Sequence, residues 1–134
     1  ALRGPVGYDL ASILKDCYVD WPRARVEAWV ADFRAGLLDG GAQGRLLAGD
    51  SGAQFLRWFD LVGLQRHIKV LGIFARLCWR DGKPGYLGDL PRTLQYVRDV
   101  AVLYPELAAF SRFVEQRLVP GLAAANARAL AARA

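Results

Sequence analysis

Apolar residues recur at steps of three and four along most of this chain, which is the spacing of one face of an α-helix. The longest such pattern runs from Gln54 to Trp79. Its apolar positions almost surround the predicted helix and leave a narrow polar stripe, formed by Gln65, Lys69 and Arg76 with Arg66 and His67 beside it. A helix that is apolar over most of its circumference usually has neighbours on several sides. We therefore expect this helix to be the central element of the fold.

Shorter amphipathic patterns on both sides of this segment predict further helices, with prolines in the first turns of two of them. These helices cover residues 8–18, 22–38, 90–103 and 107–118, and an Ala-rich helical tail follows them. Between them we expect a glycine-rich loop over 39–52, a turn and extended link over 80–86, and an interruption at Pro120. Because no segment has the alternation of a strand, the sequence predicts an all-α chain of five to six helices.

Composition narrows the class of protein. With 134 residues, of which 54% are hydrophobic, the chain fits one domain with a packed core. The net charge of +5 occurs without a run of like charges, so we expect no nucleic-acid partner. No apolar run approaches the length of a membrane span, so we expect no membrane-spanning segment. Cys17 and Cys78 lie among apolar residues, as reduced thiols of a cytoplasmic protein do. The chain has no methionine and begins within a turn-rich phrase, so we expect a piece of a longer or processed protein.

The residues that carry chemistry do not by themselves specify a reaction. The single histidine has no ligand partners at zinc spacing, and the glycine-rich segment lacks the Gly-Lys-Ser/Thr of a phosphate-binding loop. Several other groups have two interpretations each. The basic stripe can bind phosphate or form a solvated helix edge, and the aromatic residues can stack on a sugar or close the core. The carboxylates can gather in one cluster, although nothing in the sequence brings them together: Asp9, Asp16, Asp20 and Asp60.

Three stretches resemble the aminoglycoside phosphotransferase-like kinases, and among them the bacterial branch of N-acetylmuramate/N-acetylglucosamine anomeric kinases of cell-wall recycling. They are Gly4–Pro22, Phe59–Leu77 together with Arg80–Tyr86, and the corner Leu103–Leu107. The resemblance implies that the whole chain, residues 1–134, is the C-terminal helical part of a phosphotransferase domain with a protein-kinase-like α+β fold. In that family the ATP-binding lobe, the His-Gly-Asp catalytic loop and the metal-binding Asp motif all come earlier in the sequence.

The same resemblance assigns roles to residues of this chain. It implies an ATP- and Mg²⁺-dependent kinase acting on an amino sugar or an aminoglycoside-like hydroxyl, with no catalytic or metal-binding residue in this segment. The segment alone should then be inactive and bind no cofactor, because phosphoryl transfer needs positioned metal and phosphates. Asp9 matches an Asp of the family phrase that orients the catalytic loop. Candidates for the wall of the sugar site are Asp16, Tyr18, Trp21, Arg66 and His67.

Two other classes of function fit the same residues. The chain can be a stand-alone helical binding module, a class that the basic stripe and the aromatic residues favour. It can also be a pseudokinase remnant that keeps the helical lobe without catalysis. If the chain is a separated lobe, it exposes apolar surface that the missing part normally covers, and we then expect it to self-associate.

Overall fold

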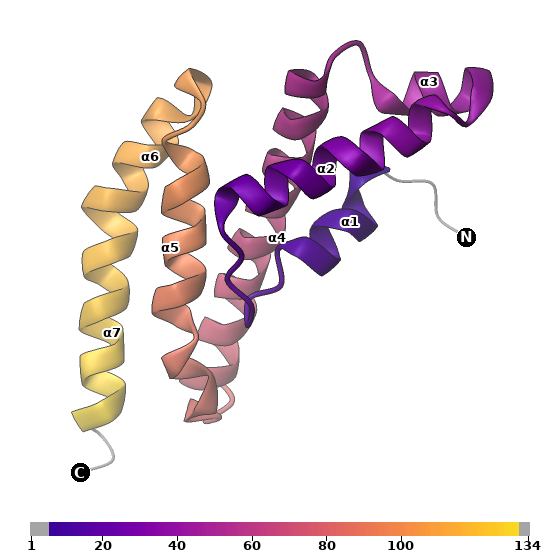
Figure 1. The fold of residues 1–134 in the computed structure, drawn as a ribbon. Helices are drawn as coiled ribbons and strands as arrows, with labels where there is room; N and C mark the ends of the chain where they lie inside the picture. Colours follow the sequence, from indigo (N-terminus) through magenta and orange to yellow (C-terminus); the bar gives the residue numbers. More distant parts are fainter. Residues whose placement is uncertain (1–5, 132–134) are drawn as a thin grey trace. The chain divides into compact units, whose positions relative to one another are not determined.

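The structure, a computed structural model, describes residues 6–131, without the side chains of residues 84 and 87. Within this range every regular element is helical, so the all-α prediction is confirmed (Figure 1). The chain divides into two compact units, and the boundary between Gly63 and Leu64 falls inside the longest helix. The α-helices are α1 (Gly7–Leu14), α2 (Arg23–Leu38), α3 (Gly41–Ala48), α4 (Gly52–Trp79), α5 (Leu90–Ala101), α6 (Ala108–Phe113) and α7 (Val119–Ala131).

The first unit is built from α1, α2, α3 and the beginning of α4, and it has its own apolar core. This core consists of Ala11, Val26, Val30, Phe55 and Phe59, each of them at most 6% exposed. Partly buried aliphatic side chains of α1, α2 and α4 surround it. Apolar positions of three helices thus meet in one core, of which Val26 and Val30 were predicted as inward residues.

The glycine-rich segment is not the predicted loop, because residues 41–48 form α3. Gly41 begins this helix with a φ of +71°, a left-handed conformation that glycine adopts without strain. Gly44 is buried against α2, and a Cβ at this position would lie 1.9 Å from the carbonyl oxygen of Leu37. The glycines therefore allow the chain to reverse tightly and α3 to pack closely on α2, a use that composition alone does not distinguish from a loop.

The connection between α1 and α2 is longer than predicted, because α1 ends at Leu14. The Asp16 carboxylate accepts a hydrogen bond from the backbone N–H of Tyr18 at 2.8 Å, and such a local bond competes with helix continuation. Helix α2 then begins after Pro22, which occupies the N-cap position. At the start of α4 the Ser51 hydroxyl caps the helix and accepts the N–H of Gln54 at 3.1 Å.

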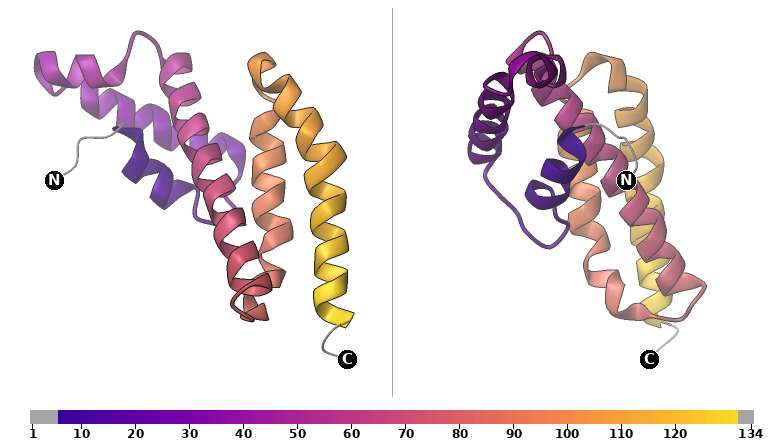
Figure 2. Two further views of the ribbon diagram at one scale, coloured as in Figure 1. Left: turned by 180° about the vertical axis from the view of Figure 1, so that it is seen from behind. Right: turned by 90° about the vertical axis from the view of Figure 1, so that its right-hand side faces the viewer.

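The second unit contains the rest of α4, then α5 and the rod formed by α6 and α7, and the chain direction reverses from each of these three rods to the next (Figure 2). Helix α5 is the most buried of them, and its inward residues are Leu90, Leu94, Val97 and Ala101, spaced by three and four as predicted. Two short 3₁₀ helices join the rods, Pro84–Gly88 and Pro105–Leu107. The first of these replaces part of the extended link expected after α4.

Helix α6 continues into α7 through a π-helical turn, Val114–Leu118, instead of being interrupted at Pro120. Proline has no N–H to donate to the carbonyl four residues earlier, and its ring crowds that carbonyl. The wider π turn avoids both problems, because the Val119 N–H donates to the carbonyl of Val114, five residues back. Residues 108–131 are therefore one continuous helix, and the seven α-helical segments of the described chain form six rods.

Candidate functional site

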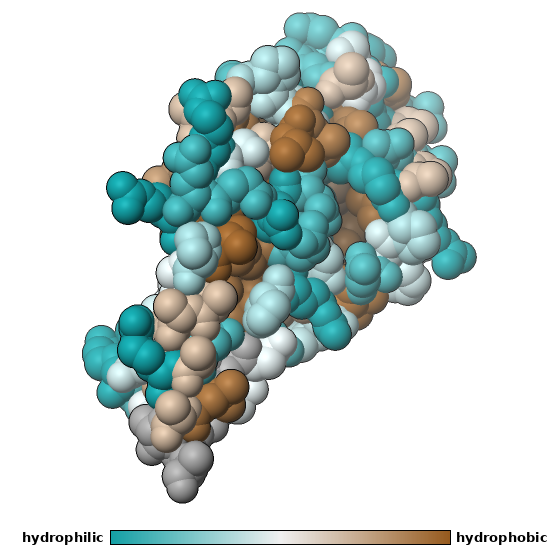
Figure 3. Space-filling model, turned by 90° about the vertical axis from the view of Figure 1, so that its left-hand side faces the viewer, coloured by the Kyte–Doolittle hydropathy of each residue, from teal (hydrophilic) through white to brown (hydrophobic). Residues whose placement is uncertain are grey.

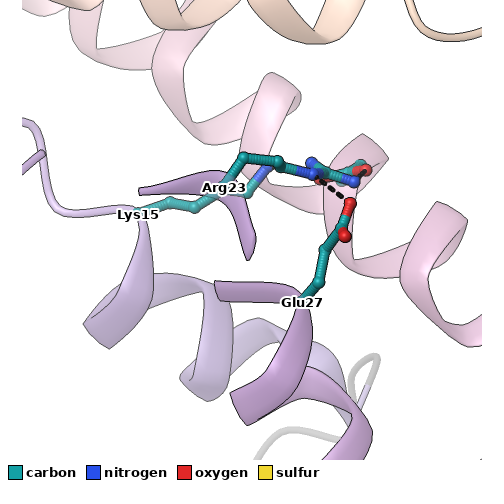
Figure 4. Close-up of polar contacts among 4 residues, drawn as sticks. Lys15, Arg23 and Glu27 are labelled. Atoms are coloured by element: carbon teal, nitrogen blue, oxygen red, sulfur yellow. Dashed lines mark hydrogen bonds and ion pairs between the residues drawn. The ribbon is translucent and has the colours of Figure 1, made fainter. Parts of the chain in front are cut away.

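The α1–α2 loop, residues 15–22, is fixed at both ends by one buried carboxylate of α4. Lys15 Nζ lies 2.6 Å from Asp60 Oδ1 at the start of the loop. Just after its end, the Arg23 guanidinium binds both oxygens of Asp60, at 2.7 and 2.8 Å. Figure 4 shows Lys15 and Arg23 extending toward the same place, with Glu27 pointing at Arg23 from the next turn of α2. The loop is thus held on a rigid scaffold, as binding loops commonly are.

The charges of this cluster are unequally buried. The Asp60 side chain is fully buried, that of Lys15 is 10% exposed and that of Arg23 is 39% exposed. Burial lowers the pKa of the Lys15 ammonium, and this effect exceeds the opposite effect of Asp60. The hydrogen bonds to Asp60 raise the pKa of Arg23 above its usual value. A buried carboxylate with two cationic partners satisfies the rule that a buried charge needs compensation.

Sequence reasoning missed this cluster, although one signal for it was present. Asp60 lies four residues from Leu56 and four from Leu64, so it interrupts an apolar stripe of α4. An acidic residue in such a stripe is normally buried with a cationic partner. The partners themselves were not predictable, because they lie 45 and 37 residues away in the sequence. Asp60 is thus grouped with cations, and the carboxylate cluster that the sequence left open is not what surrounds it.

Three predicted substrate-binding residues lie together on the loop that this cluster anchors. Asp16 is half-buried, Tyr18 is 55% exposed and Trp21 is 37% exposed. The Trp21 ring meets the Trp29 ring edge to face at 5.2 Å between centroids. The Arg25 guanidinium lies over both indoles, 5.8 Å from the first centroid and 5.1 Å from the second. The loop and the first two turns of α2 therefore present aromatic surface, a cation and a carboxylate within one short stretch.

These groups are suited to a polyhydroxylated ligand. An exposed aromatic ring such as Trp21 can pack against the apolar C–H face of a sugar. The carboxylate of Asp16 keeps a second oxygen that can accept a hydrogen bond from a hydroxyl. Packing against Trp29 and Arg25 limits the rotation of the Trp21 ring, so less conformational entropy is lost when a ligand binds.

The other two predicted residues, Arg66 and His67, belong to the second unit. His67 is 3% exposed and its ring stacks on that of Tyr96, with centroids 5.0 Å apart. Arg66 is half-buried on the same helix. Within the second unit His67 is thus packed on an aromatic neighbour and is not part of an exposed polar stripe. The role of both residues in substrate binding stays a prediction.

Asp9 lies in the first turn of α1 and is exposed. Its carboxylate is placed favourably with respect to the helix dipole. Whether it orients a catalytic loop stays a prediction. Among residues 6–131 no three His, Cys, Asp or Glu side chains are grouped as they would be to bind a metal ion. Over the same range no helix has the length and apolar character that crossing a membrane requires.

Bacterial proteins named N-acetylmuramate/N-acetylglucosamine kinase are similar to this chain. The protein of Pseudomonas putida is 46% identical over 116 residues, which make up 87% of this chain and 33% of that protein. That of Pseudomonas aeruginosa is 46% identical, with coverage of 81% and 31%, and that of Neisseria meningitidis is 43% identical with the same coverage. The chain resembles one part of these kinases. It spans about a third of the length of the curated relatives it matches.

Other comparisons do not extend this result. No family model matches the chain, and no solved structure matches it. The similarity to proteins named as kinases of amino sugars is therefore established, whereas membership of the aminoglycoside phosphotransferase-like family stays a prediction. Of the two cysteines, Cys78 is buried and Cys17 is half-buried.

Proposed function

We propose that this chain is the C-terminal helical part of an ATP-dependent kinase that phosphorylates an amino sugar of the N-acetylmuramate or N-acetylglucosamine type. The observation that carries the proposal is the identity of 42–46% to four proteins with that name. The residues that bind Mg²⁺ and the catalytic base would lie in the part of the protein outside this segment. The protein would act in cell-wall recycling in the cytoplasm, where ATP is available.

Within this function we assign the α1–α2 loop to the acceptor site. Trp21 would pack on the sugar ring and Asp16 would accept a hydroxyl hydrogen bond, while Tyr18 borders the same surface. Lys15, Arg23 and Asp60 would act as positioning residues, because their ion pairs with one another hold the two ends of the loop. Asp9 would support the catalytic loop from the start of α1.

A chimera tests the proposal directly. The segment of the Pseudomonas putida kinase that aligns with this chain is replaced by residues 1–134, and ATP-dependent phosphorylation of N-acetylmuramate and N-acetylglucosamine is measured. We expect activity within about tenfold of the parent enzyme, because interfaces tolerate many substitutions that conserve volume and pattern. A chimera that is folded by circular dichroism but inactive on both sugars would contradict the proposal.

The same chimera separates the alternative functions. Activity on an aminoglycoside and not on the amino sugars would show that the proposed substrate class is wrong and that the proposed kinase activity is right. ATP binding without transfer to any acceptor would favour a pseudokinase remnant. Tight, salt-dependent binding of nucleic acid by the 134-residue chain would instead favour a stand-alone binding module.

A further inference from the structure

The second unit contains a groove of about 550 Å³ that the proposed kinase function does not use. Helices α4 and α6–α7 form its walls and α5 its floor, and Figure 2 shows these three rods side by side. Most of the lining is apolar and includes Ile68, Leu71, Trp79, Leu94, Phe110 and Leu122. The predicted central helix therefore has one apolar face that lines a groove and is not covered by a neighbouring helix, and Ile68 is accordingly 42% exposed.

Two glycines keep this groove open. Gly72 of α4 and Gly121 of α7 both line it, and a Cβ built on either would meet no atom within 4 Å. Neither has a positive φ, so the backbone does not require glycine at these positions. Glycine inside a helix lowers stability relative to alanine. The volume that the two missing side chains leave is available to a ligand.

Positive charge lies on one wall of the groove. Arg117 and Arg128 line it, are exposed, and within the described part of the chain neither is paired with a carboxylate. They are eleven residues apart, which places them on the same face of the helix and about 16 Å apart along its axis. Arg117 also belongs to the π turn, a conformation that is rare in helices and frequent at functional sites.

We propose that this groove binds a long-chain carboxylate, with the alkyl chain on the apolar floor and the carboxylate paired with a guanidinium of the wall. The volume lies within the range of about 300–1,000 Å³ that small-molecule sites occupy. One turn of a helix with its side chains fills about 420 Å³, from a pitch of 5.4 Å and a diameter of 10 Å, so the groove holds little more than one turn of a second helix. Arginine and carboxylate form charge-assisted, bidentate hydrogen bonds. The inference does not depend on the proposed kinase function.

The test measures binding of dodecanoate and of the neutral 1-dodecanol to the 134-residue chain by calorimetry, below the concentration at which either probe aggregates. We expect one dodecanoate per chain, bound more tightly than the alcohol. The double variant R117Q/R128Q should bind dodecanoate about tenfold more weakly and leave the alcohol unchanged, since only the charge-assisted hydrogen bond is removed. Trp79 lines the groove, so its fluorescence should change on binding.

A filled groove provides the second arm. Gly72→Leu should abolish binding of both probes, while the matched variant Gly72→Ala, which adds only a methyl group, should still bind the alcohol. Gly121→Leu repeats the filling from the opposite wall, and circular dichroism identifies a variant that has lost its fold. Equal binding by the wild-type chain and both leucine variants would overturn the proposal. So would equal affinity for the two probes, or a stable dimer that excludes them.

Discussion

Replacing Asp60 by asparagine removes the charge that holds both ends of the α1–α2 loop. The change leaves the Lys15 ammonium, 10% exposed, with a neutral partner, and it removes the bidentate pair with Arg23. Breaking one side of a buried ion pair destabilises a protein by about 3–5 kcal/mol. Arg23 is 39% exposed and keeps Glu27 at 2.6 Å, so its share is discounted for solvent screening. We therefore expect a loss of about 3 kcal/mol, at the lower end of that range, which comes mainly from Lys15.

The assay is urea unfolding followed by tryptophan fluorescence, because three of the four tryptophans lie in the first unit. Asp81→Asn is the matched control, since this exposed carboxylate pairs only at the surface with Arg80 and its loss should leave the midpoint nearly unchanged. The variant Asp60→Asn/Lys15→Met removes both charges and should recover part of the loss. A loss below about 1 kcal/mol for Asp60→Asn would refute the reasoning, because it would mean that Lys15 is not held by a buried charge.

Three further predictions concern the same unit. Gly44→Ala should destabilise the chain by about 2 kcal/mol or more in urea unfolding, because the added Cβ would meet the Leu37 carbonyl oxygen. The control Gly36→Ala places its methyl group in open space and should stabilise the chain by about 0.5–1 kcal/mol. In the folded chain the pKa of Lys15 is lowered from 10.5, so between the folded and the unfolded pKa values the unfolded chain binds more protons at this residue. The contribution of Lys15 to the free energy of unfolding should therefore rise with pH across that window. Urea unfolding at a series of pH values that shows a fall attributable to Lys15 would contradict this. In the kinase chimera Trp21→Ala should raise the KM for the sugar about five- to tenfold with little change in kcat, and an unchanged KM would exclude stacking on this ring.

The candidate site shows how far the sequence can be interpreted. Of the five residues predicted for the sugar site, Asp16, Tyr18 and Trp21 lie on one loop, because residues so close in sequence must also be close in space. Arg66 and His67 were predicted for the same site from the family resemblance and lie beside the polar stripe of a helix, yet His67 is buried against Tyr96. A stripe on a single helix does not reveal which part of it another helix covers. The positions of neighbouring elements decide that, and helical periodicity carries no information about them.

The sequence by itself determined the helical class and most helix positions, because the spacing of apolar residues, the prolines in first turns and the Ser51 cap all act within a few residues. Only the tertiary structure decided what the residues that break the helical pattern do. The glycines of 40–49 became a close contact between α2 and α3, and Pro120 was accommodated within a helix by a π turn. Asp60 found cationic partners 45 and 37 residues away. Each of these outcomes depends on contact between segments whose meeting local propensity does not specify.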